Sequence, residues 1–317
     1  MSAWSDFIAS QSLSETADTP LLAHCDHLAV IRAHGEEAGH YLQGQLSCDL
    51  RDVDQGAHRQ GMHLSLKGRG LVCVRVVKSG DDYLLLCPAS QREAVIKALM
   101  KYRLRAKVDF QVDDEAVVLG LAGNLQDTGL AVLPAAGESH QGEHALLLRY
   151  LHNEQLLLIT DSRQAEALWR RLAAHRTVTG ANGWLCQDIA AGEGQLFPGA
   201  EDLFLPQVLN LDVTGGVSFK KGCYTGQEVV ARMHFKGKLK QRMQRIDYRA
   251  DIPLAAGQVL RDKDGKAAGE VVFSAAAREG HRALVALRRD AEGDWYVDQQ
   301  PLQASLVSLP YGLPWKE

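Results

Sequence analysis

One cysteine of this chain stands in a sequence context that favours a reactive thiol. Cys223 follows Lys220 and Lys221 and precedes a capping box, with Thr225 as the N-cap residue and Glu228 three positions further on. We therefore expect a helix to start at Thr225. A thiol just before a helix N-terminus and beside lysines gains thiolate character, because the helix dipole and the ammonium groups stabilise the anion. The alternative is that Cys223 is a small buried apolar residue, as free cysteines often are.

Basic residues are concentrated around and directly after this cysteine. The segment 220–249 contains nine lysines and arginines and two acidic residues, whereas the whole chain has 35 basic and 39 acidic residues. A basic segment in an acidic chain suits a polyanion such as RNA phosphates or a polyglutamate tail. The alternative is a solvated basic face that has no ligand.

Trp184 is the third candidate, because an indole can stack on a flat heteroaromatic ring. The common alternative is a tryptophan of the hydrophobic core. A fourth group, His24-Cys25-Asp26-His27, has the residue types of a metal site. Successive residues of a strand point to opposite faces, so these four side chains cannot converge on one ion. We therefore expect no metal site.

The hydrophobic pattern indicates the elements that must position these residues. Residues 1–20 are polar and aperiodic, which predicts a flexible N-terminal arm. Residues 21–239 mix hairpin-like strands with helical stripes, which is typical of an α+β region. Residues 240–317 consist of short alternating segments separated by turn signals, which predicts an all-β domain.

Composition restricts the compartment and the class of protein. The six cysteines include no CxxC pair, which argues against a disulfide scaffold or a zinc ribbon. The N-terminus lacks the basic start of a targeting signal, and no apolar run approaches the roughly 20 residues of a membrane helix. We expect a cytoplasmic protein that makes no membrane contact.

The segment 216–228, Gly-Val-Ser-Phe-Lys-Lys-Gly-Cys-Tyr-Thr-Gly-Gln-Glu, closely resembles the signature of the YgfZ-type folate-binding tRNA-modifying proteins. These are relatives of the T-protein of the glycine cleavage system, an aminomethyltransferase. Other stretches agree in the same order along nearly the whole chain: Tyr41 to Gln45, Lys101-Tyr102 with Lys107-Val108, Gly183 to Leu185, Phe204 to Gln207 with Asn210-Leu211, and Leu309 to Tyr311. The resemblance implies a three-lobed fold around a central folate site, with two interleaved α+β lobes and a C-terminal β-barrel-like domain.

The resemblance also implies roles for individual residues. Trp184 matches one of two tryptophans associated with the folate in this family, and the second falls near Leu28, which is aliphatic here. The implied cofactor is tetrahydrofolate or a one-carbon derivative. Cys223 becomes the reactive thiol, with Lys221 beside it as a second catalytic candidate. Further cofactor contacts are expected from Gln207, Tyr224, Gln227, Glu228 and Arg232.

One departure from the family pattern separates this chain from the aminomethyltransferases. Those enzymes carry an aspartate, in a Gly-Gly-Ile-Leu-Asp-Asp type segment, that assists chemistry at a folate nitrogen. The matching segment here, residues 69–75, contains no carboxylate. A general acid or base is therefore missing at that position, and we do not expect glycine cleavage.

The function implied is support of iron–sulfur enzymes and of tRNA modification, specifically methylthiolation. The expected partners are folate, an iron–sulfur tRNA-modifying enzyme, and tRNA in contact with the basic segment 232–249. Two alternatives remain open: a folate-dependent one-carbon transferase, and a non-catalytic module that binds tRNA or a partner protein. The sequence does not decide whether the protein is an enzyme.

Overall fold

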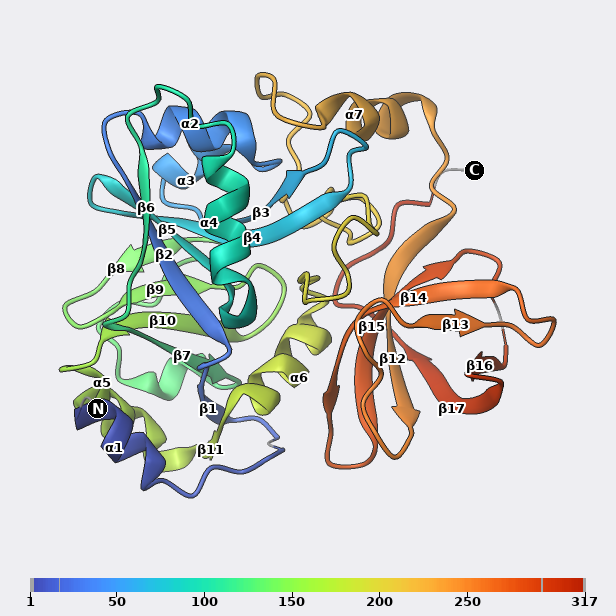
Figure 1. Cartoon of the computed structure of the whole chain (residues 1–317). Helices are drawn as coiled ribbons and strands as arrows, with labels where there is room; N and C mark the ends of the chain where they lie inside the picture. Colours follow the sequence, from blue (N-terminus) through green and yellow to red (C-terminus); the bar gives the residue numbers. More distant parts are fainter. Residues whose placement is uncertain (1–2, 17, 292, 316–317) are drawn as a thin grey trace.

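The computed structural model describes residues 3–16, 18–291 and 293–315. Two sheets pack face to face in one half of the molecule, and a closed barrel forms the other half (Figure 1). The first sheet has the strand order β3-β4-β5-β2-β6. Its strands are β2 (Leu28–His34), β3 (Arg59–Leu64), β4 (Gly70–Ser79), β5 (Asp82–Pro88) and β6 (Asp109–Val112).

Helices cover the outer face of this first sheet. They are α2 (Ala38–Gln45), α3 (Leu50–Asp54) and α4 (Arg92–Met100), which follows the short 3₁₀ turn η1 (Ala89–Gln91). Val72, Val74 and Val76 point from β4 into the core beneath these helices. The alternate residue Val77 lies in a different cluster, between the two sheets. Because both faces of β4 are covered, the strand is apolar almost throughout.

The second sheet has the order β11-β1-β7-β10-β9-β8. Its strands are β1 (Leu21–His24), β7 (Ala116–Ala122), β8 (Ser139–Gln141), β9 (Leu146–Arg149), β10 (Gln155–Asp161) and β11 (Thr177–Thr179). Strand β1 pairs in parallel with β11, although Leu21 and its partner Thr177 are far apart in sequence. The next strand along the chain, β2, belongs to the first sheet. The two lobes are therefore interleaved, as the resemblance implies.

The outer face of the second sheet packs on α1 (Ala3–Ala9) and α5 (Ala165–Leu172). The turns η2 (Leu125–Thr128) and η3 (Ala173–His175) belong to the same lobe. Helix α1 corrects the expectation of a flexible arm over residues 1–20, of which 1, 2 and 17 lie outside the described residues. Trp4 is buried, and its ring lies 5.9 Å from that of Trp169. This contact holds the N-terminal segment on the sheet.

The barrel closes in the order β12-β15-β14-β13-β16-β17. Its strands are β12 (Gln241–Arg249), β13 (Val259–Arg261), β14 (Ala267–Ala276), β15 (His281–Arg288), β16 (Trp295–Val297) and β17 (Gln300–Val307). Val285 and Leu287 of β15 fill the barrel interior. The alternate residues Leu284 and Ala286 pack outward on the rest of the molecule. The structure thus contains the C-terminal β-barrel-like domain that the resemblance implies.

Helix α6 (Ala181–Ala191) lies between the second sheet and the barrel (Figure 1). Trp184 faces the sheets, whereas Cys186 and Ile189 face the barrel. A helix covered on both sides is apolar nearly all round, as this one is. A long irregular segment then leads to α7 (Gln227–Lys236), which lies beyond the β3–β4 hairpin. Among the described residues, no helix combines the length and the apolar character needed to cross a bilayer.

Candidate functional site

The loop that carries Cys223, residues 216–226, is fastened to the segment between α2 and α3. The Ser47 hydroxyl donates to the carbonyl of Gly216 at 2.6 Å, and the Ser218 amide donates to the carbonyl of Ser47 at 3.0 Å. Lys221 is buried, and its Nζ donates to the carbonyls of Leu46 at 2.8 Å and Cys48 at 2.6 Å. Burial lowers the pKa of Lys221 to about 8. The Lys221 ammonium thus holds the loop in place.

Cys223 itself is exposed, and it differs in this from the other five cysteines. All six lie in the described part of the chain, and Cys25, Cys48, Cys73, Cys87 and Cys186 are buried. Burial raises the pKa of Cys48 to about 11, which makes that thiol a poor nucleophile. The structure therefore supports an accessible thiol at Cys223 and does not support its alternative as a buried apolar residue.

The helix after Cys223 begins later than the sequence predicts. Helix α7 starts at Gln227, and Gly226 is its N-cap residue with no side-chain cap. Gly226 adopts a φ of 77°, and a Cβ there would lie 2.5 Å from the Ser65 carbonyl oxygen. The Thr225 amide instead donates to the Gly44 carbonyl at 3.2 Å. The predicted capping box from Thr225 to Glu228 is therefore wrong, and the effect of the helix dipole at Cys223 is weaker than expected.

A small cavity lies where the two sheets, α6 and the segment after it meet. Its walls comprise residues of β2, β3, β4, β5 and β10 together with α6, and they include Leu28 as the resemblance implies. The complete lining is His27, Leu28, Gln60, Arg75, Leu86, Tyr150, Leu157, Leu185, Asp188, Glu193, Gln195 and Phe197. We refer to this space as the central cavity.

Four charged or polar side chains form a linked cluster in the central cavity. Arg75 donates to Glu193 at 2.7 Å, and its guanidinium carbon lies 4.4 Å from the centre of the Tyr150 ring. The Tyr150 hydroxyl donates to Asp188 at 3.0 Å. Burial raises the pKa of Asp188 to about 7, against the opposing effect of Arg75. The cavity therefore contains a carboxyl group that exchanges its proton near neutral pH.

Other polar atoms in the cavity wall have no partner. Gln60 is buried and donates through Nε2 to the Gly194 carbonyl, but its Oε1 accepts no hydrogen bond in the structure. Both ring nitrogens of His27 also lack a partner, and burial lowers the pKa of His27 to about 4. Unpaired buried polar atoms are costly, so a polar ligand that reached them would be stabilised.

The sequence reasoning missed this cluster. A usable signal was present, since Arg75 is the one charged residue in the run from Leu71 to Val77. A charge in a strand buried on both faces requires a partner. From the sequence we assign His27 no role, because we expect no metal site at residues 24–27. In the structure His27 lines the central cavity.

Trp184 lies behind the cavity wall. It has no exposed surface, and its ring meets that of Tyr150 edge to face at 5.9 Å. The indole thus supports Tyr150, and Leu28 is the predicted residue that lines the cavity directly. The cavity volume is about 30 Å³, whereas ligand pockets usually exceed about 300 Å³. A ligand as large as a pterin can enter only if the surrounding side chains, such as Leu28 and Phe197, move apart.

The remaining predicted cofactor residues belong to the surroundings of α7, and none of them is in the described lining of the central cavity: Gln207, Tyr224, Gln227, Glu228 and Arg232. Gln207 donates to the Val230 carbonyl at 2.8 Å, which ties the irregular segment to the helix. Gln227 accepts from the Tyr224 amide at 3.2 Å. Glu228 and Arg232 are exposed. The structure thus separates these residues into an α7 group near Cys223 and a cavity group around Leu28.

The segment 69–75 has no carboxylate in the structure either, but the cavity does. Cys73 is fully buried, and burial raises the pKa of its thiol. Asp188 of α6 and Glu193 supply the carboxyl groups from a different part of the chain. The absence of acidic residues in this one segment therefore does not leave the cavity without a proton-exchanging group.

The basic segment divides into an exposed and a structural part. Arg242 is buried and pairs with Asp212 at 2.8 Å, and Arg245 pairs with Asp247 at 3.2 Å. The exposed cations of the segment are Lys220, Arg232, Lys236, Lys238, Lys240 and Arg249. A polyanion would meet mainly the surface around α7 and the residues that follow it, to Lys240.

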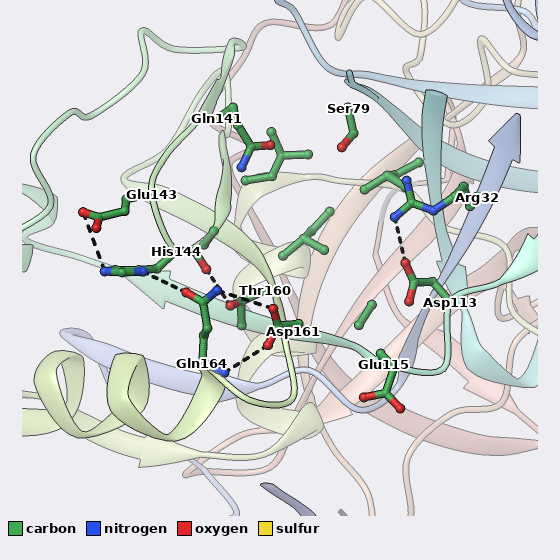
Figure 2. A pocket seen from close by; sticks show the side chains of 15 residues that line it. Arg32, Ser79, Asp113, Glu115, Gln141, Glu143, His144, Thr160, Asp161 and Gln164 are labelled. Atoms are coloured by element: carbon green, nitrogen blue, oxygen red, sulfur yellow. Dashed lines mark hydrogen bonds and ion pairs between the residues drawn. The ribbon is translucent and has the colours of Figure 1, made fainter. Parts of the chain in front are cut away.

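A more open pocket of about 240 Å³ lies elsewhere, between Arg32 of β2 and Gln164 at the start of α5 (Figure 2). Several of its polar groups pair with one another. Arg32 pairs with Asp113 at 2.9 Å, and His144 shares a hydrogen bond with Gln164 at 2.8 Å. It contains none of the residues that the sequence singled out, so we assign it no role.

The arrangement of two interleaved α+β lobes and a barrel matches a known fold. The structure aligns with the glycine cleavage system aminomethyltransferase T from Bartonella henselae with a TM-score of 0.71. The two chains are 19% identical, and the match covers 93% of this chain and 87% of the other. The protein therefore has the T-protein fold.

Curated relatives define the family more closely. No protein-family model matches the chain. However, the tRNA-modifying proteins YgfZ of Shigella dysenteriae serotype 1, Shigella boydii serotype 4 and Escherichia coli O7:K1 are each 31% identical to it over 311 residues. These matches cover 94% of this chain and 95% of each relative. The chain belongs to the YgfZ family of tRNA-modifying proteins.

Proposed function

We propose that this protein binds a reduced folate in the central cavity and supports tRNA modification through the thiol of Cys223. The relatives are named for tRNA modification, and the T-protein fold is shared with an aminomethyltransferase. The client we propose is an iron–sulfur tRNA-modifying enzyme, served in the cytoplasm. When bound, tetrahydrofolate or its one-carbon derivative supplies a carrier for one-carbon units.

The observation that carries the folate proposal is the unpartnered Oε1 of Gln60 in the cavity wall. A pterin presents N–H donors along one edge. Gln60 together with the carboxyl oxygens of Asp188 and Glu193 gives that edge acceptors of matching kind. Leu28 and Phe197 supply apolar surface for the ring faces. The lining residues therefore suit a pterin in chemical type, and the cavity must open for the ring to enter.

Calorimetry with tetrahydrofolate tests this proposal. Gln60→Leu removes one acceptor and should weaken binding about fivefold, since a neutral hydrogen bond contributes about 1 kcal/mol. Gln141→Leu changes a glutamine in the pocket of Figure 2 and should bind like the wild type. Absence of binding by the wild type, or equal affinity of all three proteins, would show that folate does not bind in this cavity.

The thiol is tested separately. In a strain that lacks the protein, Cys223→Ser should fail to restore tRNA methylthiolation. Cys186→Ser, which alters a buried thiol, should restore it. If both variants restore the modification as well as the wild type does, Cys223 has no role in it.

Asp188 favours a second candidate, a folate-dependent one-carbon transferase. A carboxyl group with a pKa of about 7 can both donate and accept a proton at neutral pH. Purified protein would then turn over methylene- or formyl-tetrahydrofolate, and Asp188→Asn would abolish turnover without abolishing binding. Folate binding without any turnover by the wild type would leave the first proposal as the function.

A further inference from the structure

Three aromatic rings gather where the Cys223 loop meets α7, and we refer to Phe219, His234 and Phe235 as the aromatic cluster. The rings of Phe219 and His234 are stacked, with centroids 3.7 Å apart and an interplanar angle of 19°. The Phe235 ring stands nearly perpendicular to that of His234, at 4.8 Å. Phe219 packs against the hydrophobic core, whereas Phe235 is 68% exposed. The cluster is thus anchored on one side and presents a bare ring to solvent on the other.

Positive charge is concentrated in the part of the chain that carries this ring. Between residues 220 and 240 the exposed cations are Lys220, Arg232, Lys236, Lys238 and Lys240, and Glu228 is the one acidic residue of that interval. Lys236 directly follows Phe235 at the end of α7, and Lys238 follows within the next turn of chain. The ring is therefore placed in a positive electrostatic field.

An exposed planar ring among lysines matches the chemistry of unpaired nucleotides. Single-stranded RNA offers bases that stack on aromatic side chains and phosphates that pair with lysines. A duplex offers phosphates alone, because its bases are stacked on one another. An acidic protein surface would pair with the lysines but would not require a planar ring at their centre.

We propose that the aromatic cluster binds single-stranded RNA, with Phe235 stacking on an unpaired base and Lys236 and Lys238 contacting the adjacent phosphates. This inference rests on the proposed function insofar as it assigns the RNA to a tRNA loop. It adds to that function the surface that meets the substrate RNA, in the part of the chain that continues from Cys223.

Fluorescence anisotropy with a labelled 12-nucleotide unstructured RNA, and with a blunt-ended duplex of the same strand, tests the proposal. The wild type should bind the unstructured RNA more tightly than the duplex. Phe235→Leu keeps an apolar side chain of similar bulk but removes the ring, and it should weaken binding of the unstructured RNA at least about fivefold. Phe235→Tyr should restore most of the affinity. Phe235 is exposed, so these variants leave the core unchanged.

A salt titration distinguishes the contribution of the lysines to RNA binding from that of the Phe235 ring. The double variant Lys236→Gln/Lys238→Gln should reduce the slope of log K against log salt by about 1.4, since each phosphate contact in single strands contributes about 0.7. Phe235→Leu should leave the slope unchanged. Equal binding of the unstructured RNA by Phe235→Leu and wild type, equal affinity of the wild type for the duplex, or no RNA binding at all would overturn the proposal.

The experiment contains no folate and does not depend on Cys223. A negative result for RNA binding therefore does not affect the tests of folate binding and of the thiol. Negative results in those tests likewise leave RNA binding measurable. If Phe235→Leu also restores tRNA methylthiolation in the deletion strain as well as wild type does, the cluster has no part in that process. If the wild type binds no RNA, an acidic protein partner becomes the occupant to test.

Discussion

Arg75 Nη2 lies 2.7 Å from Glu193 Oε2, and both side chains are about nine-tenths buried. The pair joins β4 of the first sheet to the segment that follows α6, so it crosses from one lobe to the other. Arg75 also donates to His58 Nδ1 at 3.0 Å, and His58 Nε2 faces the Arg149 carbonyl at 2.8 Å. The wall of the central cavity is therefore pinned by a charge network that spans both sheets.

Removing one partner of this pair should be strongly destabilising. Arg75→Met leaves the Glu193 carboxylate buried without its cation and should lower the free energy of unfolding by about 3–5 kcal/mol. Urea denaturation followed by circular dichroism measures this. The double variant Arg75→Met/Glu193→Leu should recover much of the loss. If the effects of the two single changes simply add, the two residues are not coupled in the way the distance indicates.

Asp188 should make stability depend on pH. Its folded-state pKa of about 7 lies above its ordinary value of 3.8. The stabilisation it provides is therefore full below pH 3.8 and is lost as the pH rises toward 7. Asp188→Asn stays neutral throughout, so its Tm relative to that of the wild type should rise between pH 4.5 and 8. We expect a relative gain of at least about 1 kcal/mol, which is about 2 °C here.

Two buried histidines make the stability of the protein depend on pH in the direction opposite to that of Asp188. Burial lowers the pKa of His27 to about 4 and that of His58 to about 3. Their contribution to stability is present above the unfolded pKa of 6.5 and is lost as the pH falls toward these values. The wild type and Asp188→Asn share this loss, so it cancels in the difference between their Tm values. A Tm difference that stays constant from pH 4.5 to 8 would contradict the titration of Asp188.

The contact between β7 and Trp184 leaves no room for a side chain. A Cβ at Gly120 would lie 2.2 Å from Cε3 of the indole. Gly120→Ala should therefore destabilise the protein by about 1–3 kcal/mol through overpacking. Gly44→Ala is the matched control, because a Cβ there meets nothing within 4 Å and alanine suits the interior of α2. Thermal unfolding should show a lower Tm for the first variant and no loss for the second.

The burial of five of the six thiols predicts the outcome of a labelling experiment. Native protein should react quickly with one equivalent of Ellman's reagent per chain, at Cys223. Unfolded protein should react with six. Cys223→Ser should show no fast phase in the native state. A fast-reacting thiol in that variant would show that the buried cysteines become accessible by local opening.

Sequence patterns predicted the strands and the barrel well because those depend on local periodicity. The first strand of the barrel, β12, starts at Gln241. The position of Trp184 could not be predicted in the same way. Helix α6 is covered on both sides, so its sequence carries no polar face to show which side the indole takes.

The roles of the charged residues were harder to predict, because a count of charges in the sequence does not show which of them are buried. Lys221 and Arg242 add to the basic segment in the sequence, yet both are buried and hold backbone or carboxylate oxygens. The charged cluster in the central cavity joins Arg75 to Asp188 and Glu193. These residues belong to elements that lie more than a hundred positions apart in the sequence. The YgfZ resemblance identified Leu28 but gave no indication of the polar groups opposite it.

The parallel pairing of β1 with β11 has a consequence for how such proteins can diversify by recombination. A genetic crossover between residues 24 and 177 would build the second sheet from strands of two parents, because Leu21 and Thr177 lie side by side in it. A crossover near residue 240 would exchange the barrel whole and would leave the cavity lining with one parent. The two α+β lobes are therefore inherited as a unit, whereas the barrel is the part that can be replaced.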